Sequence, residues 1–192
     1  MEENCTGISP QSLEWCDGKI NLPGIRTNVF FIPQRDIVAW PTIPETFTTD
    51  MSVLAVYQGN FTLAEDKKWN KMQVLVDKSP VTSESQGSKP SKTTLVKATF
   101  VHPGTEEKAT AFCRLANNDD YVYLVQTKPG KYRTIGNDMY QTETNPSQNL
   151  GGAPTDEMGT ILDVSVTDMM PAPFYTGIIE TVDGDINVPV GP

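Results

Sequence analysis

Short runs in which apolar and polar residues alternate predict that this chain is built mainly from β-strands. The clearest run covers residues 160–168, where Leu162, Val164 and Val166 alternate with Ile161, Asp163, Ser165 and Thr167, as in a strand with one buried face. Further strands are expected where β-branched and aromatic residues cluster between turn residues. They cover residues 26–32, 52–64, 69–78, 94–101, 121–127 and 131–136.

One segment, residues 105–117, has the pattern of an α-helix. Thr105 is expected to cap its N-terminus, and Glu106 and Glu107 follow in the first turn, where the helix dipole favours acidic side chains. Apolar residues then recur on one face of this helix, at Ala109, Phe112, Cys113 and Ala116. The pattern predicts a mainly β fold, an antiparallel β-sandwich or half-barrel, with one flanking α-helix.

Four segments without a regular pattern predict arms and loops around a β domain of residues 25–177. Residues 1–24 are expected to form an extended N-terminal arm. Residues 78–93 are expected to form a long polar loop, and residues 137–159 a long exposed loop rich in Gly and Pro. Residues 178–192 are expected to form a C-terminal hairpin or arm, because Asp183-Gly184 is a strong signal for a two-residue turn.

The charge of the chain narrows the range of partners. Fifteen Lys and Arg residues stand against 24 Asp and Glu residues, a formal net charge of -9 at pH 7. An acidic surface repels nucleic acid and anionic membranes, so we expect neither to be bound.

The three Cys residues and the N-terminal segment bear on the compartment. The Cys residues make no disulfide framework and are expected to be reduced, with a Cys5–Cys16 disulfide as the alternative. The N-terminus lacks an apolar signal region, and no run approaches the roughly 20 apolar residues of a membrane span. These features predict a soluble protein made in the cytoplasm.

Residues suited to catalysis or cofactor binding are scarce. His102 is the single histidine and precedes Pro103-Gly104, so a turn or packing role is favoured over acid–base catalysis. No zinc or phosphate-loop spacing occurs, and Asn118-Asp119-Asp120 lacks the alternating ligands of a calcium loop. We therefore expect no catalytic residue, no metal site and no cofactor, and an enzyme is the least favoured class.

Five blocks of sequence, all within residues 25–177, carry a resemblance to a known family. They read RDIVAWPTIP, VTSESQG, FVHPGTEEKATAFCRLANNDDYVYLV, KYRTIGN and MPAPFYTG. These blocks resemble small structural proteins from tailed bacteriophages and prophages of Bacteroidetes bacteria, which we interpret as major tail tube proteins. The resemblance implies the fold shared by phage tail tubes and the inner tubes of type VI secretion systems.

The resemblance also implies an assembly. Six subunits would close a ring whose inner wall is a continuous β-barrel, and stacked rings would form the tube in the tail of the virion. The helix would lie outside the wall as a brace, the 78–93 loop would reach an adjacent ring, and both termini would be arms between subunits or rings. The residues expected to contact the adjacent ring are Ser83, Gln86, Lys89 and Lys92. Partners would be further copies of the chain, the terminator, tape measure and distal tail proteins, and double-stranded DNA that passes without specific binding.

The excess of acidic over basic residues predicts that carboxylates face the lumen of such a tube. A cationic wall would bind DNA at many phosphates, whereas an anionic wall leaves the duplex mobile. Candidates are Asp77, Glu84 and Asp163, each expected on an alternating strand, with the tube exterior as the alternative location. Two other classes stay open. One is a terminator, distal tail or head–tail connector protein that forms a single ring, and the other is a carbohydrate- or cell-surface-binding β module.

Overall fold

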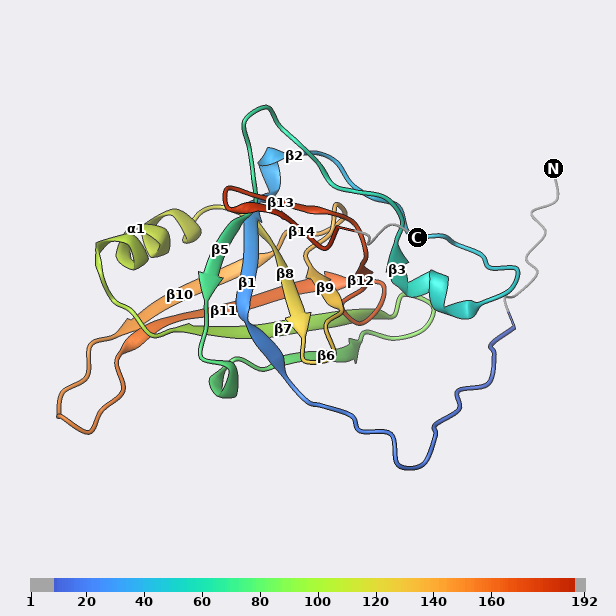
Figure 1. Ribbon diagram of the computed structural model, residues 1–192, viewed down its shortest axis with the longest axis horizontal. Helices are drawn as coiled ribbons and strands as arrows, with labels where there is room; N and C mark the ends of the chain where they lie inside the picture. The colour runs from blue at the N-terminus through green and yellow to red at the C-terminus, as the bar shows by residue number, and fades with distance from the viewer. Residues whose placement is uncertain (1–8, 189–192) are drawn as a thin grey trace.

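Two β-sheets and one α-helix form the framework of the fold, as a computed structural model describing residues 9–188 shows (Figure 1). The larger sheet has six strands in the order β3-β12-β9-β8-β1-β5, and the smaller has four in the order β10-β11-β7-β6. Small two-stranded sheets are formed by β2 with β4 and by β13 with β14. The predicted mainly β sandwich with one helix is confirmed.

The elements have the following bounds. The six-stranded sheet contains β1 (Ile25–Pro33), β3 (Val56–Tyr57), β5 (Asn70–Gln73), β8 (Tyr121–Thr127), β9 (Tyr132–Ile135) and β12 (Phe174–Tyr175). The four-stranded sheet contains β6 (Val81–Gln86), β7 (Thr93–His102), β10 (Glu143–Asn149) and β11 (Gly159–Asp168). The remaining elements are β2 (Ile37–Ala39), β4 (Thr62–Leu63), β13 (Ile179–Thr181), β14 (Gly184–Ile186), α1 (Glu107–Ala116) and the 3-10 helices η1 (Gln34–Asp36), η2 (Met51–Ala55) and η3 (Val76–Lys78).

The main core lies between the two sheets. Leu162, Val164 and Val166 of β11 are buried there, while Asp163 of the same strand is exposed, so the predicted alternation is confirmed. β7 and the six-stranded sheet supply the facing apolar residues, which are Val96, Ala98, Phe100, Val29, Tyr123, Val125 and Ile135. Burial of alternate side chains therefore sets which side of the smaller sheet meets solvent.

The six-stranded sheet is buried on both sides, which explains the continuous apolar run of β8. Tyr123 and Val125 face the main core, whereas Val122 and Leu124 face a second cluster with Trp69. Segments from β2–β4 and the β13–β14 hairpin cover this second side, so the molecule has three layers (Figure 1). A strand buried on both faces needs apolar residues at every position rather than at alternate ones.

The polar segments expected to be loops at 78–93 and 137–159 each contain a strand. β6 pairs with β7 over all six of its residues, and β10 pairs with β11 over all seven. The prediction of loops was therefore wrong for β6 and for β10. A strand at the edge of a half-solvated sheet can take polar residues, because its backbone pairing does not depend on apolar side chains. The loops that remain are residues 87–92 and the segments on either side of β10.

Two other predicted strands differ from the structure. Residues 52–55 belong to the 3-10 helix η2, and β3 and β4 are short strands separated by Gly59, which has φ +92°. The strand expected at 69–78 ends at Gln73 and is followed by η3.

The two ends of the described chain behave differently. Residues 9–24 are exposed and form no strand, as the prediction of an arm requires, and Gln11 hydrogen-bonds to Thr49 and Met51 beside η2. The C-terminal hairpin exists, but Ile179 and Thr181 are buried in the second cluster and its surroundings, so it is part of the domain rather than a free arm. Its turn residues are Val182 and Asp183, one position before the predicted pair. The predictions for residues 1–8 and 189–192 lie outside the described residues.

Candidate functional site

The solvent-facing side of the four-stranded sheet is a regular polar surface that the strand register defines. We call it the polar sheet face. Its charged residues are Glu84, Lys97, Glu143 and Asp163, one from each strand. The neutral positions on the same side include Thr82, Gln86, Thr93, Leu95, Thr99, Val101, Asn145, Ser147, Ile161, Ser165 and Thr167. Directly paired residues share a side of a sheet, so these assignments follow from the register.

Side-chain contacts connect neighbouring strands across the polar sheet face. Thr99 Oγ1 donates to Asp163 Oδ1 at 2.7 Å, and Lys97 Nζ lies 2.5 Å from Glu84 Oε1. Gln86 Nε2 donates to the hydroxyl oxygens of Thr93 and Thr167. Three carboxylates and one amine give this face an excess of negative charge.

Two of the three predicted lumenal carboxylates lie on this face, and the third does not. Glu84 and Asp163 are both exposed there. Asp77 lies in η3, between β5 and β6, so the prediction that it occupies a strand position was wrong. The sequence alternates through Asp77, but the chain leaves the sheet after Gln73. Glu143 was missed because its strand was assigned to a loop.

The residues expected in one inter-ring loop are divided between a strand and a turn. Ser83 and Gln86 belong to β6, whereas Lys89 and Lys92 lie in the exposed turn before β7. Only the two lysines therefore sit in a segment free of sheet pairing.

The helix α1 packs beside the sandwich through the predicted apolar stripe. Ala109 and Ala116 are buried, and Phe112 and Cys113 are partly buried. Phe112 contacts Phe31 of β1 with a ring-centroid distance of 4.8 Å. Burial raises the pKa of the Cys113 thiol. The helix thus covers one end of the main core.

The start of α1 differs from the prediction. Glu106, not Thr105, is the N-cap residue, and no side chain caps the helix. The pKa of the Glu106 carboxyl is lowered, first by its own backbone N–H and then by the hydrogen bond with His102. His102 Nδ1 lies 2.8 Å from Gln73 O, a contact that joins the end of β7 to the end of β5.

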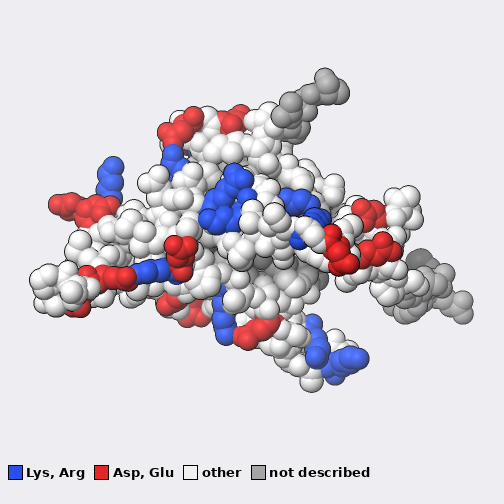
Figure 2. Space-filling view, turned by 60° about the horizontal axis from the view of Figure 1, so that its bottom comes forward, with Lys and Arg blue, Asp and Glu red and all other residues white. Residues whose placement is uncertain are grey.

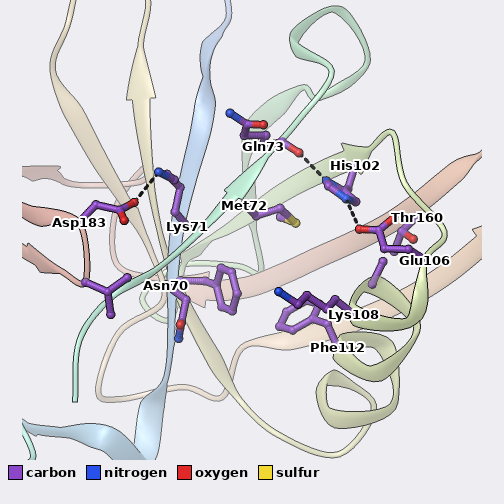
Figure 3. A pocket seen from close by; sticks show the side chains of 13 residues that line it. Asn70, Lys71, Met72, Gln73, His102, Glu106, Lys108, Phe112, Thr160 and Asp183 are labelled. Atoms are coloured by element: carbon purple, nitrogen blue, oxygen red, sulfur yellow. Dashed lines mark hydrogen bonds and ion pairs between the residues drawn. The ribbon is translucent and has the colours of Figure 1, made fainter. Parts of the chain in front are cut away.

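A cleft of about 630 Å³ separates α1 from the outer edge of β5 (Figure 3). Phe31, Met72, Ala109 and Phe112 provide its apolar lining. Its polar margin contains Lys71, His102, Glu106, Lys108 and Asp183. Lys71 pairs with Asp183 at 2.7 Å and His102 with Glu106 at 3.4 Å, whereas Lys108 has no ion pair among residues 9–188. The cleft combines an apolar floor with a sheet edge.

Basic residues gather at a different place. Arg26 donates to Lys128 O in the β8–β9 turn, and Arg133 and Lys131 both lie over the ring of Phe174. None of these four cations forms an ion pair with another described residue. Figure 2 shows Lys and Arg gathered near the middle of one side of the molecule, with Asp and Glu mainly toward the margins. This basic group belongs to the six-stranded sheet and its ends, not to the polar sheet face.

No group of three or more His, Cys, Asp and Glu side chains within residues 9–188 is arranged to hold a metal ion. No helix in this range is long and apolar enough to cross a membrane.

Comparison with known proteins adds no family to this description. No protein-family model matches the chain, and neither does any curated protein or solved structure.

Proposed function

We propose that this chain is a structural subunit that assembles into rings, and that stacked rings form the tail tube through which a bacteriophage passes its DNA. The observation that carries the proposal is the four-stranded sheet, which has a polar acidic outer face and two edges without a strand partner among the described residues. An unpaired sheet edge is a template for pairing with another chain, and a closed ring of subunits removes it. The function is structural and not catalytic.

The edge strand β6 is well suited to such pairing. Thr99 N–H donates to Pro80 O, so the register directs the backbone groups of Thr82, Glu84 and Gln86 toward β7. The N–H groups of Val81, Ser83 and Ser85 therefore point to the open side. At the opposite edge, β10 contains Pro146, which has no N–H and so limits pairing at that position.

Ring closure would make the polar sheet face the wall of a channel. Six copies with four strands each give 24 strands, and at about 4.8 Å per strand the circumference is roughly 115 Å. Barrels of about 16–18 strands already enclose an aqueous channel. A channel of this size follows from the sheet width and the six-fold ring that the family resemblance implies.

The charge of the polar sheet face would then keep DNA moving. A DNA duplex carries about one negative charge per 1.7 Å, and each phosphate that meets a cation adds to binding. This face carries three carboxylates, those of Glu84, Asp163 and Glu143, against the single amine of Lys97. The wall would therefore repel the phosphate backbone of DNA at close approach. Salt screens this repulsion beyond about 8 Å. The subunit would be made in the host cytoplasm, reside in the virion tail, and contact the terminator, tape measure and distal tail proteins.

A terminator or head–tail connector ring is the second candidate, because the same open edges would also close a single ring. A carbohydrate-binding module is less favoured, because Trp69 is buried and Trp40 packs against Phe61 at 5.2 Å rather than forming an open aromatic platform.

Electron microscopy of the purified full-length chain tests the proposal. Long tubes are expected, lone rings would favour a connector, and a monomer at all concentrations would contradict self-assembly. Ser83→Pro removes an outward N–H without removing a β6–β7 hydrogen bond, so it should abolish rings and tubes while the monomer stays folded by circular dichroism. Ser83→Ala is the matched control and should assemble normally. Tubes formed by Ser83→Pro would exclude pairing through this edge.

A further inference from the structure

The outer edge of β5 carries backbone groups that point away from β1, the strand with which β5 pairs. Val74 N–H donates to Thr27 O at 2.8 Å, which directs the even-numbered residues of this segment toward β1. Antiparallel pairing alternates along a strand, so the backbone groups of Lys71 and Gln73 point to the opposite side. That side is the cleft next to α1 (Figure 3).

Neighbouring segments satisfy the two ends of this edge but not its middle. Trp69 N–H donates to Glu180 O at 2.9 Å, and Gln73 O accepts a hydrogen bond from His102 Nδ1 at 2.8 Å. The N–H and C=O of Lys71 and the N–H of Gln73 have no hydrogen-bond partner among residues 9–188. The cleft therefore offers two donors and one acceptor in the geometry of a β-ladder, beside an apolar floor formed by Met72, Phe31 and Phe112.

The N-terminal arm has the complementary properties. Leu13 is 89% exposed and Trp15 is 59% exposed, and their i, i+2 spacing places both side chains on one side of an extended segment. Glu14 is the one charged residue between Ser9 and Cys16, and its negative charge complements that of the unpaired Lys108 in the cleft. Contact of these two side chains with another chain would remove their apolar surface from water.

The arm of the same molecule is directed away from the cleft. Gln11 Nε2 donates to Thr49 O at 2.9 Å, and Met51 N–H donates to Gln11 Oε1 at 2.8 Å, which holds the arm beside η2. Figure 1 shows η2 and α1 at opposite ends of the molecule. The arm is thus placed to reach a neighbour.

We propose that residues 12–15 of one copy bind as an added β-strand in the cleft between β5 and α1 of a second copy. Leu13 and Trp15 contact the apolar floor, Glu14 pairs with Lys108, and the arm backbone bonds to Lys71 and Gln73. In strand addition of this kind, main-chain hydrogen bonds provide the affinity. The fit of every second side chain into the binding site provides the specificity. The proposal requires that the chain associates with itself, but not that the assembly is a tube.

Isotope-mixed cross-linking tests the contact directly. Equal amounts of ¹⁵N-labelled and unlabelled full-length chain are mixed under dissociating conditions, reassembled and treated with a carbodiimide that joins carboxylates to amines. Mass spectrometry should find Glu14 joined to Lys108 in peptide pairs that mix the two isotopes. Pairs of a single isotope only, or no such pair, would overturn the proposal.

Two variants with matched controls test the strand addition. Gln73→Pro removes an outward N–H and keeps the carbonyl that His102 binds, so the Glu14–Lys108 product should fall at least tenfold, while Gln73→Ala leaves it unchanged. Leu13→Ser with Trp15→Ser should have the same effect, with Ser12→Ala as control. Microscopy of the same samples separates the two proposals. Tubes without the cross-link reject the arm contact alone, and the cross-link without tubes rejects the tail tube alone.

Discussion

The hydroxyl group of Tyr123 in β8 lies 2.9 Å from Thr144 Oγ1 in β10, inside the main core. Tyr123 is fully buried and Thr144 nearly so, and the bond joins the six-stranded sheet to the edge strand of the four-stranded sheet. Burial raises the pKa of Tyr123, so the phenol stays protonated and able to donate. A directional bond at this point favours one placement of β10 over neighbouring registers.

A double-mutant cycle should detect this bond as a coupling energy. Tyr123→Phe and Thr144→Val should each lower the free energy of unfolding by about 1–2 kcal/mol, because each leaves a buried polar group without its partner. The double variant should cost less than the sum, with a coupling of about 1 kcal/mol. Urea unfolding measures all four values. Tyr140→Phe, at an exposed tyrosine, is the control and should change stability by less than about 0.5 kcal/mol.

Side chains of α1 should contribute to the free energy of unfolding only on the side of the helix that packs against the core. Phe112→Ala removes the aromatic contact with Phe31 and should cost about 2 kcal/mol, less than the loss at a fully buried Phe because the ring is partly exposed. Leu115→Ala is the control in the same helix, since Leu115 is 61% exposed, and should cost less than about 0.5 kcal/mol. Equal losses in thermal unfolding would show that α1 does not cover the core as described.

Asp168 should make stability depend on pH. Burial raises the pKa of its carboxyl above the ordinary value of 3.8, and its Oδ1 accepts from Met169 N–H at 2.6 Å. The negative charge of Asp138 acts in the same direction. The unfolded chain therefore loses this proton at a lower pH than the folded chain, and the free energy of unfolding falls as pH rises through that interval.

The variant Asp168→Asn should remove that contribution to the pH dependence. Its free energy of unfolding should decrease less than that of the wild type as pH rises above the ordinary pKa of Asp, about 3.9, because no proton is lost at this position. Denaturant titrations across the interval measure the difference. Parallel curves for the two proteins would show that folding does not raise the pKa of this carboxyl.

Charge on the polar sheet face should affect DNA passage and not assembly. Glu84→Lys combined with Asp163→Lys reverses two exposed charges, so tubes should form while triggered DNA release from particles falls at least tenfold. Glu45→Lys combined with Glu65→Lys makes the same charge change on the β2–β4 side and should have little effect. Normal release from the first variant would place the polar sheet face outside the channel.

The sequence by itself determined the elements in which one buried face leaves a periodic pattern of apolar residues. The alternation of Leu162, Val164 and Val166 identified β11 and its buried side, and the spacing from Ala109 to Ala116 identified α1. In both cases one face of an element is buried and the opposite face is solvated. This contrast appears in the sequence as a regular spacing of apolar and polar residues.

The tertiary structure decided the elements and contacts that depend on a partner elsewhere in the chain. β6 and β10 exist because β7 and β11 offer them hydrogen bonds, so their polar residues gave no periodic signal and Glu143 was missed as a member of the polar sheet face. Asp77 shows the reverse case, in which alternation continues after the chain has left the sheet. The cleft beside β5 likewise arises only when α1, β5 and the β13–β14 turn take their places. Local sequence encodes burial of side chains, whereas strand pairing satisfies backbone groups that are the same in nearly every residue, and only the folded chain shows which of them stay open.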